Sequence, residues 1–166
     1  MKGLTLRRGD AEQMNSITGK IIECAIEIHR NLGPGLLESV YEAILGNKLT
    51  QCGFSVQKQV VVPIHYEEMT FDEGFRADLI VNNLVCVGLK SVESLAPVHS
   101  KQLLTYLKLL NLEIGVLINF GAPTIKEGLH RIVNGFKDSP SFLPLRASAP
   151  PRDPTSETSL RLRASA

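Results

Sequence analysis

The spacing of hydrophobic positions divides the chain into helical and strand-like segments. Between residues 16 and 32, apolar residues recur at steps of three and four, which predicts an amphipathic helix with Ser16 as its N-cap. Gly33-Pro34-Gly35 then breaks the chain. A second helix is expected from about residue 36 to residue 51, with Gly53 ending it as a C-terminal cap.

Three strand-like runs follow the two predicted helices. Residues 54–66 are rich in valine, and Pro63 within them favours an edge strand or a bulge. Residues 74–81 and 84–90 flank Asn82-Asn83, a two-residue connection suited to a tight hairpin because asparagine tolerates positive φ. The pattern therefore predicts antiparallel pairing of the second and third strands.

The segments after residue 90 return to a helical pattern. Pro97 precedes a helix expected over about residues 98–110, and the almost wholly apolar run 113–120 predicts a strand buried on both faces. A final helix is expected from about residue 125 to residue 133. This order predicts a mixed α/β domain, with a mixed sheet of about four strands flanked by helices and a crossover helix before the last strand.

The composition changes at Pro140 and sets the expected domain boundaries. Beyond it the chain is rich in Pro, Ser, Arg and Thr, and Leu-Arg-Ala-Ser-Ala occurs twice, at 145–149 and 162–166. We expect residues 1–15 to form an N-terminal extension, 16–139 the folded domain, and 140–166 a disordered tail. The repeat is either accidental low complexity or a recruitment signal.

The bulk composition is that of a soluble globular protein of ordinary domain size. The chain has 166 residues, 43% hydrophobic and 21% charged, and no apolar run approaches the roughly 20 residues that span a bilayer. No apolar stretch follows the basic N-terminal residues, so a secretory signal is not expected. The three cysteines show no C-x-x-C spacing and suit a reducing compartment. We therefore expect a cytoplasmic protein that does not enter a membrane.

The net charge gives no bulk electrostatic case for binding nucleic acid. The whole chain carries +1, but the part before Pro144 has 14 basic and 15 acidic residues. Non-specific nucleic-acid binding draws on a dense basic surface, which this distribution lacks. The alternative is a basic groove confined to one part of the surface.

Asp78 is the first residue with candidate chemistry, because it lies inside a strand pattern with apolar neighbours. An ionised carboxylate at such a position needs a cationic partner or a metal ion. The period of a strand places Gly88 and Lys90 on one face of the next strand, and hairpin pairing brings Asp78 near the level of Gly88. Asp78 then either forms a salt bridge with Arg76 or Lys90, or belongs to a functional site.

Two helical faces also carry polar residues at regular spacing. Glu38, Tyr41 and Glu42 share one side of the second predicted helix, although a first-turn glutamate also stabilises the helix dipole by itself. On the crossover helix, His99, Gln102 and Tyr106 lie on one flank. They line a groove beside the strand ends, or they form an ordinary solvated face.

These features follow the order of a known protein family. The run Gly35-Leu-Leu-Glu38-Ser-Val-Tyr41 matches the signature of the GxxExxY family, and the Asp78 strand, Pro97-Val-His99 and Gln102-Leu-Leu-Thr-Tyr106 are similar to it as well. The resemblance covers roughly residues 16–135. That family is placed in the PD-(D/E)XK nuclease-like superfamily, so the resemblance implies a nuclease-like core.

The resemblance also implies a reaction and a set of site residues. The implied activity is metal-dependent hydrolysis of DNA or RNA phosphodiesters with Mg²⁺ or Mn²⁺, in which the metal ion activates water and offsets charge on the phosphate. Asp78 and Lys90 match the catalytic positions, and Glu38 and Asp78 the metal ligands. The residues expected to contact substrate are Gln102, Tyr106, Tyr41 and His99.

Gly88 is where the chain departs from the family pattern. The sequence reads Val87-Gly88-Leu89-Lys90, whereas the pattern has Glu-Leu-Lys, so one metal ligand is lost. Loss of one member of a catalytic centre costs several orders of magnitude in rate. We expect impaired cleavage unless Glu73 or Glu93 substitutes. The alternative is a non-catalytic member of the fold that binds nucleic acid or protein. The sequence is also compatible with a homo-oligomer.

Overall fold

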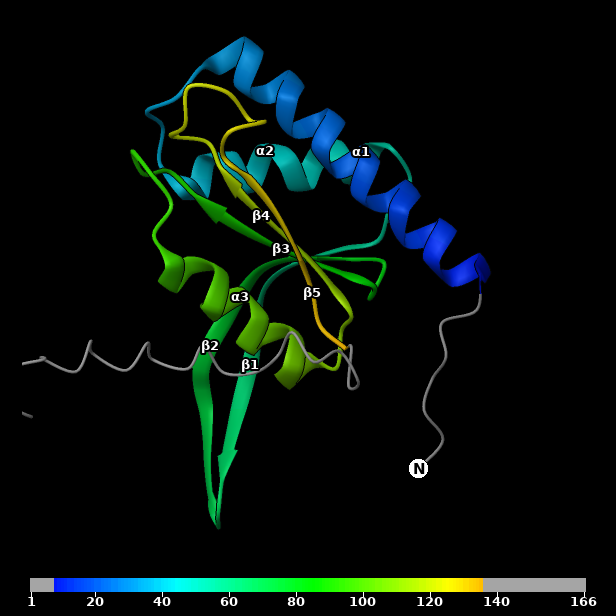
Figure 1. Ribbon diagram of the computed structural model, residues 1–166, viewed down its shortest axis with the longest axis vertical. Helices are drawn as coiled ribbons and strands as arrows, with labels where there is room; N and C mark the ends of the chain where they lie inside the picture. Colours follow the sequence, from blue (N-terminus) through cyan, green and yellow to red (C-terminus); the bar gives the residue numbers. More distant parts are fainter. Residues whose placement is uncertain (1–7, 136–166) are drawn as a thin grey trace, which may run out of the picture. The chain divides into compact units, whose positions relative to one another are not determined.

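The computed structural model describes residues 8–135, which form one sheet with helices on both of its faces (Figure 1). Three α-helices and five β-strands make up this part of the chain. In chain order they are α1 (Arg8–Leu32), α2 (Glu38–Gln51), β1 (Val56–Tyr66), β2 (Met69–Val81), β3 (Val85–Lys90), α3 (Pro97–Leu110), β4 (Ile114–Asn119) and β5 (Leu129–Val133).

The strands lie in the sheet in the order in which they occur in the chain. β3 and β4 are parallel and are joined by the crossover helix α3, while the other neighbours are antiparallel. β3 and β4 form the middle of the sheet, and their carboxyl ends, Lys90 and Asn119, lie opposite one another in register. A parallel pair requires a crossover of this kind. The loops that follow Lys90 and Asn119 therefore begin at the same edge of the sheet.

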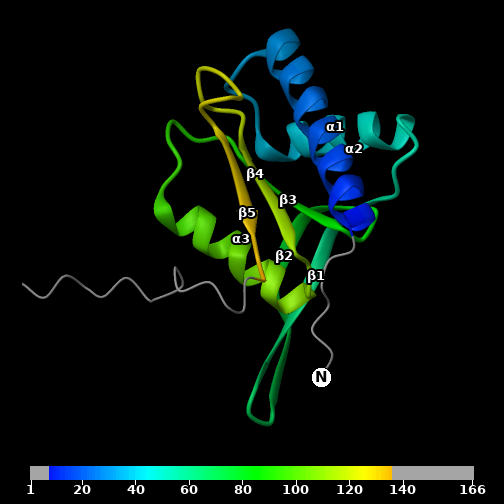
Figure 2. The same cartoon turned by 45° about the vertical axis from the view of Figure 1, so that its right-hand side comes forward.

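Two hydrophobic clusters hold the helices against the sheet. α1 and α2 pack on one face, where Ile21, Leu45 and Val116 are buried together. α3 packs on the other face, where Leu103 and Leu107 contact Cys86 and Leu117. Figure 2 shows α1 and α3 on opposite sides of β3 and β4. The result is a three-layer α/β domain, and every residue of β4 is buried, as the apolar run predicted.

The structure corrects two of the expected boundaries. The segment predicted as a final helix is a loop followed by strand β5, which pairs with β4 and raises the number of strands from about four to five. Leu129 and Ile132 are three residues apart, as in a helix. In the structure, however, residues 129–133 pair with β4 and satisfy backbone groups of β4 that would otherwise have no hydrogen-bond partner. α1 begins at Arg8 and not at Ser16, because Met14 extends the apolar stripe and is 3% exposed.

The two predicted features of the antiparallel strands are confirmed. Asn82 and Asn83 have φ values of 51° and 53° in the turn between β2 and β3. The connection has three residues and not the predicted two, because Val81 pairs with Val85 and Leu84 belongs to the turn. β1 is an edge strand whose register with β2 shifts between Val62 and Ile64, on either side of Pro63. The predicted tail and its repeat lie outside the described residues.

The distal part of the β1–β2 hairpin extends beyond the body of the sheet as an arm (Figure 1). Tyr66 pairs with Met69 and Ile64 with Phe71, so these apolar residues share one face of the arm. Tyr66, Met69 and Phe71 are each at least half exposed. No helix among residues 8–135 is both long enough and apolar enough to cross a bilayer.

Candidate active site

The candidate site forms where β2 and β3 separate. Their antiparallel ladder pairs Leu79 with Val87 and does not continue beyond that pair. The next backbone donor on β3, the N–H of Leu89, instead donates to Oδ2 of Asp78 at 2.7 Å. The Asp78 carboxylate thus takes the place of a backbone acceptor and lies between the two strands, near the level of Gly88 as the sequence predicted.

A cavity of about 100 Å³ opens beside this carboxylate. It contains six of the eight residues assigned from the sequence, contributed by three different elements. The lining residues are Arg76, Asp78, Gly88, Lys90, His99, Gln102, Leu103, Tyr106 and Leu117. Helix α3 supplies one wall and the strands supply the other, so the predicted groove beside the strand ends is present. Arg76, Leu103 and Leu117 also line it without having been assigned to the site.

Several influences act on the pKa of Asp78, and they do not all act in the same direction. Burial raises its pKa above the ordinary 3.8, and the negative charge of Glu38 adds to that effect. The hydrogen bond from the Leu89 N–H and the positive charge of Lys90 act to lower the pKa, but burial dominates. The alternative of a simple salt bridge is wrong. Arg76 pairs with Glu73 at 3.7 Å, and neither Arg76 nor Lys90 forms an ion pair with Asp78 among the residues described.

The α3 wall presents groups that donate hydrogen bonds. Nδ1 of His99 accepts a hydrogen bond from the N–H of Ala96 at 3.1 Å, which leaves Nε2 as the N–H donor of the neutral ring. Tyr106 packs against Phe75 with 5.2 Å between the ring centroids. Burial raises the pKa of Tyr106, so its hydroxyl stays protonated at neutral pH. Together with Lys90, these donors make the cavity suitable for an oxyanion such as a phosphate.

Glu38 lies close to the cavity but does not line it. It is exposed at the start of α2, where Oε1 accepts a hydrogen bond from the N–H of Ser91 at 3.3 Å. Glu42, one turn later, was not assigned to the site from the sequence. Its pKa is raised by burial and also by the charge of Asp78, which places it in the same electrostatic environment. The spacing of four residues had already placed Glu42 on the same side of the helix as Glu38.

Tyr41 has a different place from the one expected of a substrate-binding residue. Its side chain is 0% exposed and offers no surface to a substrate. The ring stacks on Phe120 at 4.2 Å, and its hydroxyl donates to the carbonyl of Gly33 at 2.6 Å. Tyr41 therefore fixes the turn that precedes Glu38 and the residue that follows β4.

Gly88 leaves space in the cavity for a larger side chain. A Cβ atom there would lie 3.3 Å from a terminal methyl of Leu117 and 3.8 Å from Leu103, contacts that a small side-chain movement relieves. No other glutamate in the described part of the chain fills the position. Glu73 and Glu93 are both exposed, and neither lines the cavity.

The residues present do not form a complete metal centre. Within residues 8–135 no group of three or more His, Cys, Asp or Glu side chains is placed to hold a metal ion. One oxygen of Asp78 already accepts a backbone N–H, Glu38 lies outside the cavity, and Gly88 supplies no ligand. Mg²⁺ binds mainly to carboxylate oxygens, so this donor set is too small by at least one carboxylate.

Comparison with known families agrees with the geometry. The family model described as the PD-(D/E)XK nuclease superfamily matches residues 15–132, which is most of the chain. The chain belongs to the PD-(D/E)XK nuclease superfamily. No curated protein and no solved structure matches it significantly. Members of this superfamily generally use divalent metal ions. In this PD-(D/E)XK domain the set of possible metal ligands is incomplete, which is a departure from that general pattern. The narrower GxxExxY resemblance stays an expectation.

Proposed function

We propose that this PD-(D/E)XK domain is a metal-dependent nucleic-acid phosphodiesterase whose cleavage is impaired by Gly88, and that it retains the cavity for DNA or RNA. The observation that carries the proposal is the position of Gly88 inside the cavity with Asp78 and Lys90. The donors of Lys90, His99 and Gln102 suit a phosphodiester, whereas the negative charge needed to hold Mg²⁺ or Mn²⁺ is missing.

The roles of the remaining residues follow from their contacts. Lys90 stabilises negative charge on the phosphate, and the neutral Tyr106 hydroxyl and the Gln102 amide orient it. Glu38 holds the loop after β3 through the N–H of Ser91, in a position to support a ligand sphere once the missing carboxylate is restored. We assign Asp78 as the one carboxylate of the present cavity that is available to a cation.

The test is restoration of the missing carboxylate. Gly88→Glu is compared with Gly88→Gln, which has nearly the same size but no charge, so that packing effects cancel. We expect Gly88→Glu to raise Mn²⁺ affinity at least tenfold and to raise Mn²⁺-dependent cleavage of a labelled oligonucleotide about a hundredfold or more. Calorimetry and a gel assay measure the two quantities. If Gly88→Glu folds and behaves as Gly88→Gln in both assays, the proposal fails.

The second candidate function is binding without catalysis. It is favoured by the absence, within residues 8–135, of any three-residue metal cluster. Binding of an oligonucleotide by the wild-type chain, with no cleavage even in Gly88→Glu, supports a nucleic-acid-binding role.

The exposed apolar face of the arm, with Tyr66, Met69 and Phe71, is the surface that suits a protein partner, including a second copy of the chain.

A further inference from the structure

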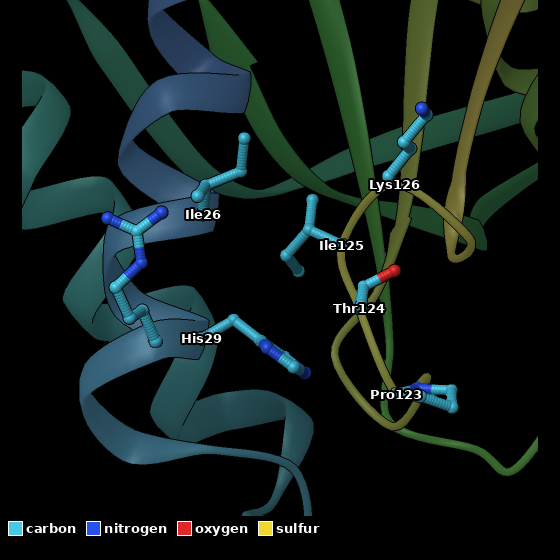
Figure 3. A pocket seen from close by; sticks show the side chains of 7 residues that line it. Ile26, His29, Pro123, Thr124, Ile125 and Lys126 are labelled. Carbon is cyan, nitrogen blue, oxygen red and sulfur yellow. The ribbon is translucent and has the colours of Figure 1, made fainter.

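A second and larger cavity lies between the end of α1 and the loop that joins β4 to β5. Its volume is about 300 Å³, the lower end of the range for small-ligand pockets. Figure 3 shows Ile26 and His29 from the helix facing Ile125 and Thr124 from the loop. The seven lining residues are Ile26, His29, Arg30, Pro123, Thr124, Ile125 and Lys126. None of them belongs to the candidate active site.

The loop wall of this pocket is held in place by tight packing. The buried side chain of Asn119 accepts the N–H groups of Val92 and Gly121, each at 3.0 Å, and donates to the carbonyl of Val92 at 2.8 Å. A Cβ atom at Gly121 would lie 2.2 Å from the oxygen of Val92, so only glycine fits there. Ile125 is 3% exposed. The pocket is therefore preformed, which lowers the entropic cost of binding a ligand.

The lining combines apolar walls with positive charge at the rim. Ile26, Pro123 and Ile125 provide the apolar surface. Arg30 and Lys126 are exposed and pair with no acidic side chain among residues 8–135. No acidic residue lines the pocket. Such a lining fits a ligand that joins a flat or apolar body to an anionic group.

His29 fixes the helix wall to the loop wall. Its Nε2 donates a hydrogen bond to the carbonyl of Ala122 at 2.9 Å, since a carbonyl only accepts. In the neutral form of the ring, Nδ1 is then free to act as an acceptor. The ring points from α1 into the space between helix and loop (Figure 3). This places one hydrogen-bond acceptor beside the apolar walls, as recognition of an exocyclic amine requires.

The pocket is connected directly to the end of the strand that carries Lys90. The N–H of Phe120, the first residue of the loop, donates to the carbonyl of Lys90 at 2.8 Å. Asn119 also joins this loop to Val92, two residues beyond Lys90. The pocket on the α1 side and the cavity on the α3 side thus flank one sheet edge.

We propose that this pocket binds a nucleoside phosphate unit, with the base against Ile26 and Ile125 and the phosphate at Arg30 and Lys126. Its source is the nucleic-acid strand whose phosphodiester occupies the Lys90 cavity, a statement that rests on the proposed function. A free mononucleotide has the same chemistry, and the experiment separates the two sources. The pocket acts in this scheme as a positioning site for a nucleotide outside the cleavage centre.

The test uses the full chain and two pocket variants. The double variant Arg30→Gln, Lys126→Gln removes the charge, and Ile26→Glu places a carboxylate at a partly exposed wall position. The control, Arg8→Gln with Arg131→Gln, also removes two charges. Arg8 lies 22 residues before Arg30 on the same helix, about 33 Å away at 1.5 Å per residue. Circular dichroism confirms that each variant is folded before binding is measured.

Binding of a labelled oligonucleotide is measured by fluorescence anisotropy and binding of adenosine monophosphate by NMR. We expect both pocket variants to weaken oligonucleotide binding about tenfold while the control changes it less than twofold. If pocket variants and control bind the oligonucleotide equally, the proposal is overturned. If the wild type binds no oligonucleotide, the proposed function fails, and the mononucleotide decides: binding that the pocket variants abolish supports a free-nucleotide site, and no binding ends the proposal.

Discussion

At the scale of single residues, Asp78 combines a structural role with an electrostatic cost. Its carboxylate accepts the Leu89 N–H where the ladder between β2 and β3 ends. Burial opposes its ionisation, and the charge of Glu38 adds to this, so its pKa in the folded state lies above that in the unfolded state. Groups held in an unfavourable state of this kind are frequent at functional sites.

The pH dependence of Asp78→Asn tests this cost. Because the folded-state pKa is raised, ionised Asp78 destabilises the fold at pH values above that pKa, and the destabilisation disappears as the pH falls below the unfolded value near 3.8. Asparagine keeps an acceptor for Leu89. We expect Asp78→Asn to be about 0.5–1 kcal/mol more stable than the wild type at pH 7. Urea unfolding should show that difference vanishing near pH 3, and a difference that grows on acidification would contradict the assignment.

At the scale of elements, Tyr41 joins α2 to β4 and to the turn after α1. Its ring stacks on Phe120, and its hydroxyl donates to Gly33 and accepts the N–H of Leu36 at 3.3 Å. Phe120 in turn donates its N–H to the carbonyl of Lys90. One buried aromatic residue thereby supports the segments that precede Glu38 and follow β4.

Removing the Tyr41 hydroxyl measures how much this junction contributes. Tyr41→Phe keeps the stack but leaves the Gly33 carbonyl and the Leu36 N–H without their partner, which should cost about 1–2 kcal/mol of unfolding free energy. The control is Tyr66→Phe, at a residue 60% exposed on the arm, where a change within about 0.5 kcal/mol is expected. Denaturant titration of both variants is the measurement. Equal effects would show that the buried hydroxyl adds nothing.

The elements also show which features sequence patterns can predict. The helices, the Asn82-Asn83 hairpin and the buried strand β4 follow from local rules, since periodicity and turn chemistry act over a few residues. β5 was missed because its strand state depends on pairing with β4, a contact invisible in its own spacing. Strand geometry predicted that Asp78 and Lys90 approach one another, and the family resemblance implied their catalytic roles. The pocket at Arg30 and Lys126 was not, because it joins residues about 100 positions apart.

At the scale of the whole molecule, charge limits how the nucleic acid of the proposed function could bind. Residues 8–135 contain 11 Lys and Arg residues against 14 Asp and Glu residues, a net charge of −3. The arm adds Glu67, Glu68, Asp72 and Glu73, which repel phosphates. Among residues 8–135, the cations that line one of the two cavities are Arg76 and Lys90 in the Lys90 cavity and Arg30 and Lys126 in the second pocket. We therefore expect the proposed binding to depend on a few contacts at one edge of the sheet and not on a broad basic surface.

The salt dependence of oligonucleotide binding tests this count of contacts. Four cations serve the two sites, namely Arg76, Lys90, Arg30 and Lys126. Each phosphate contact to a single strand contributes about −0.7 to the slope of log K against log salt concentration, so we expect a slope of roughly −3. Removing Arg30 and Lys126 should reduce it by about 1.4. Both slopes are measured by anisotropy titrations at salt concentrations from about 50 to about 200 mM. A wild-type slope near −10 would require a basic surface that residues 8–135 do not possess.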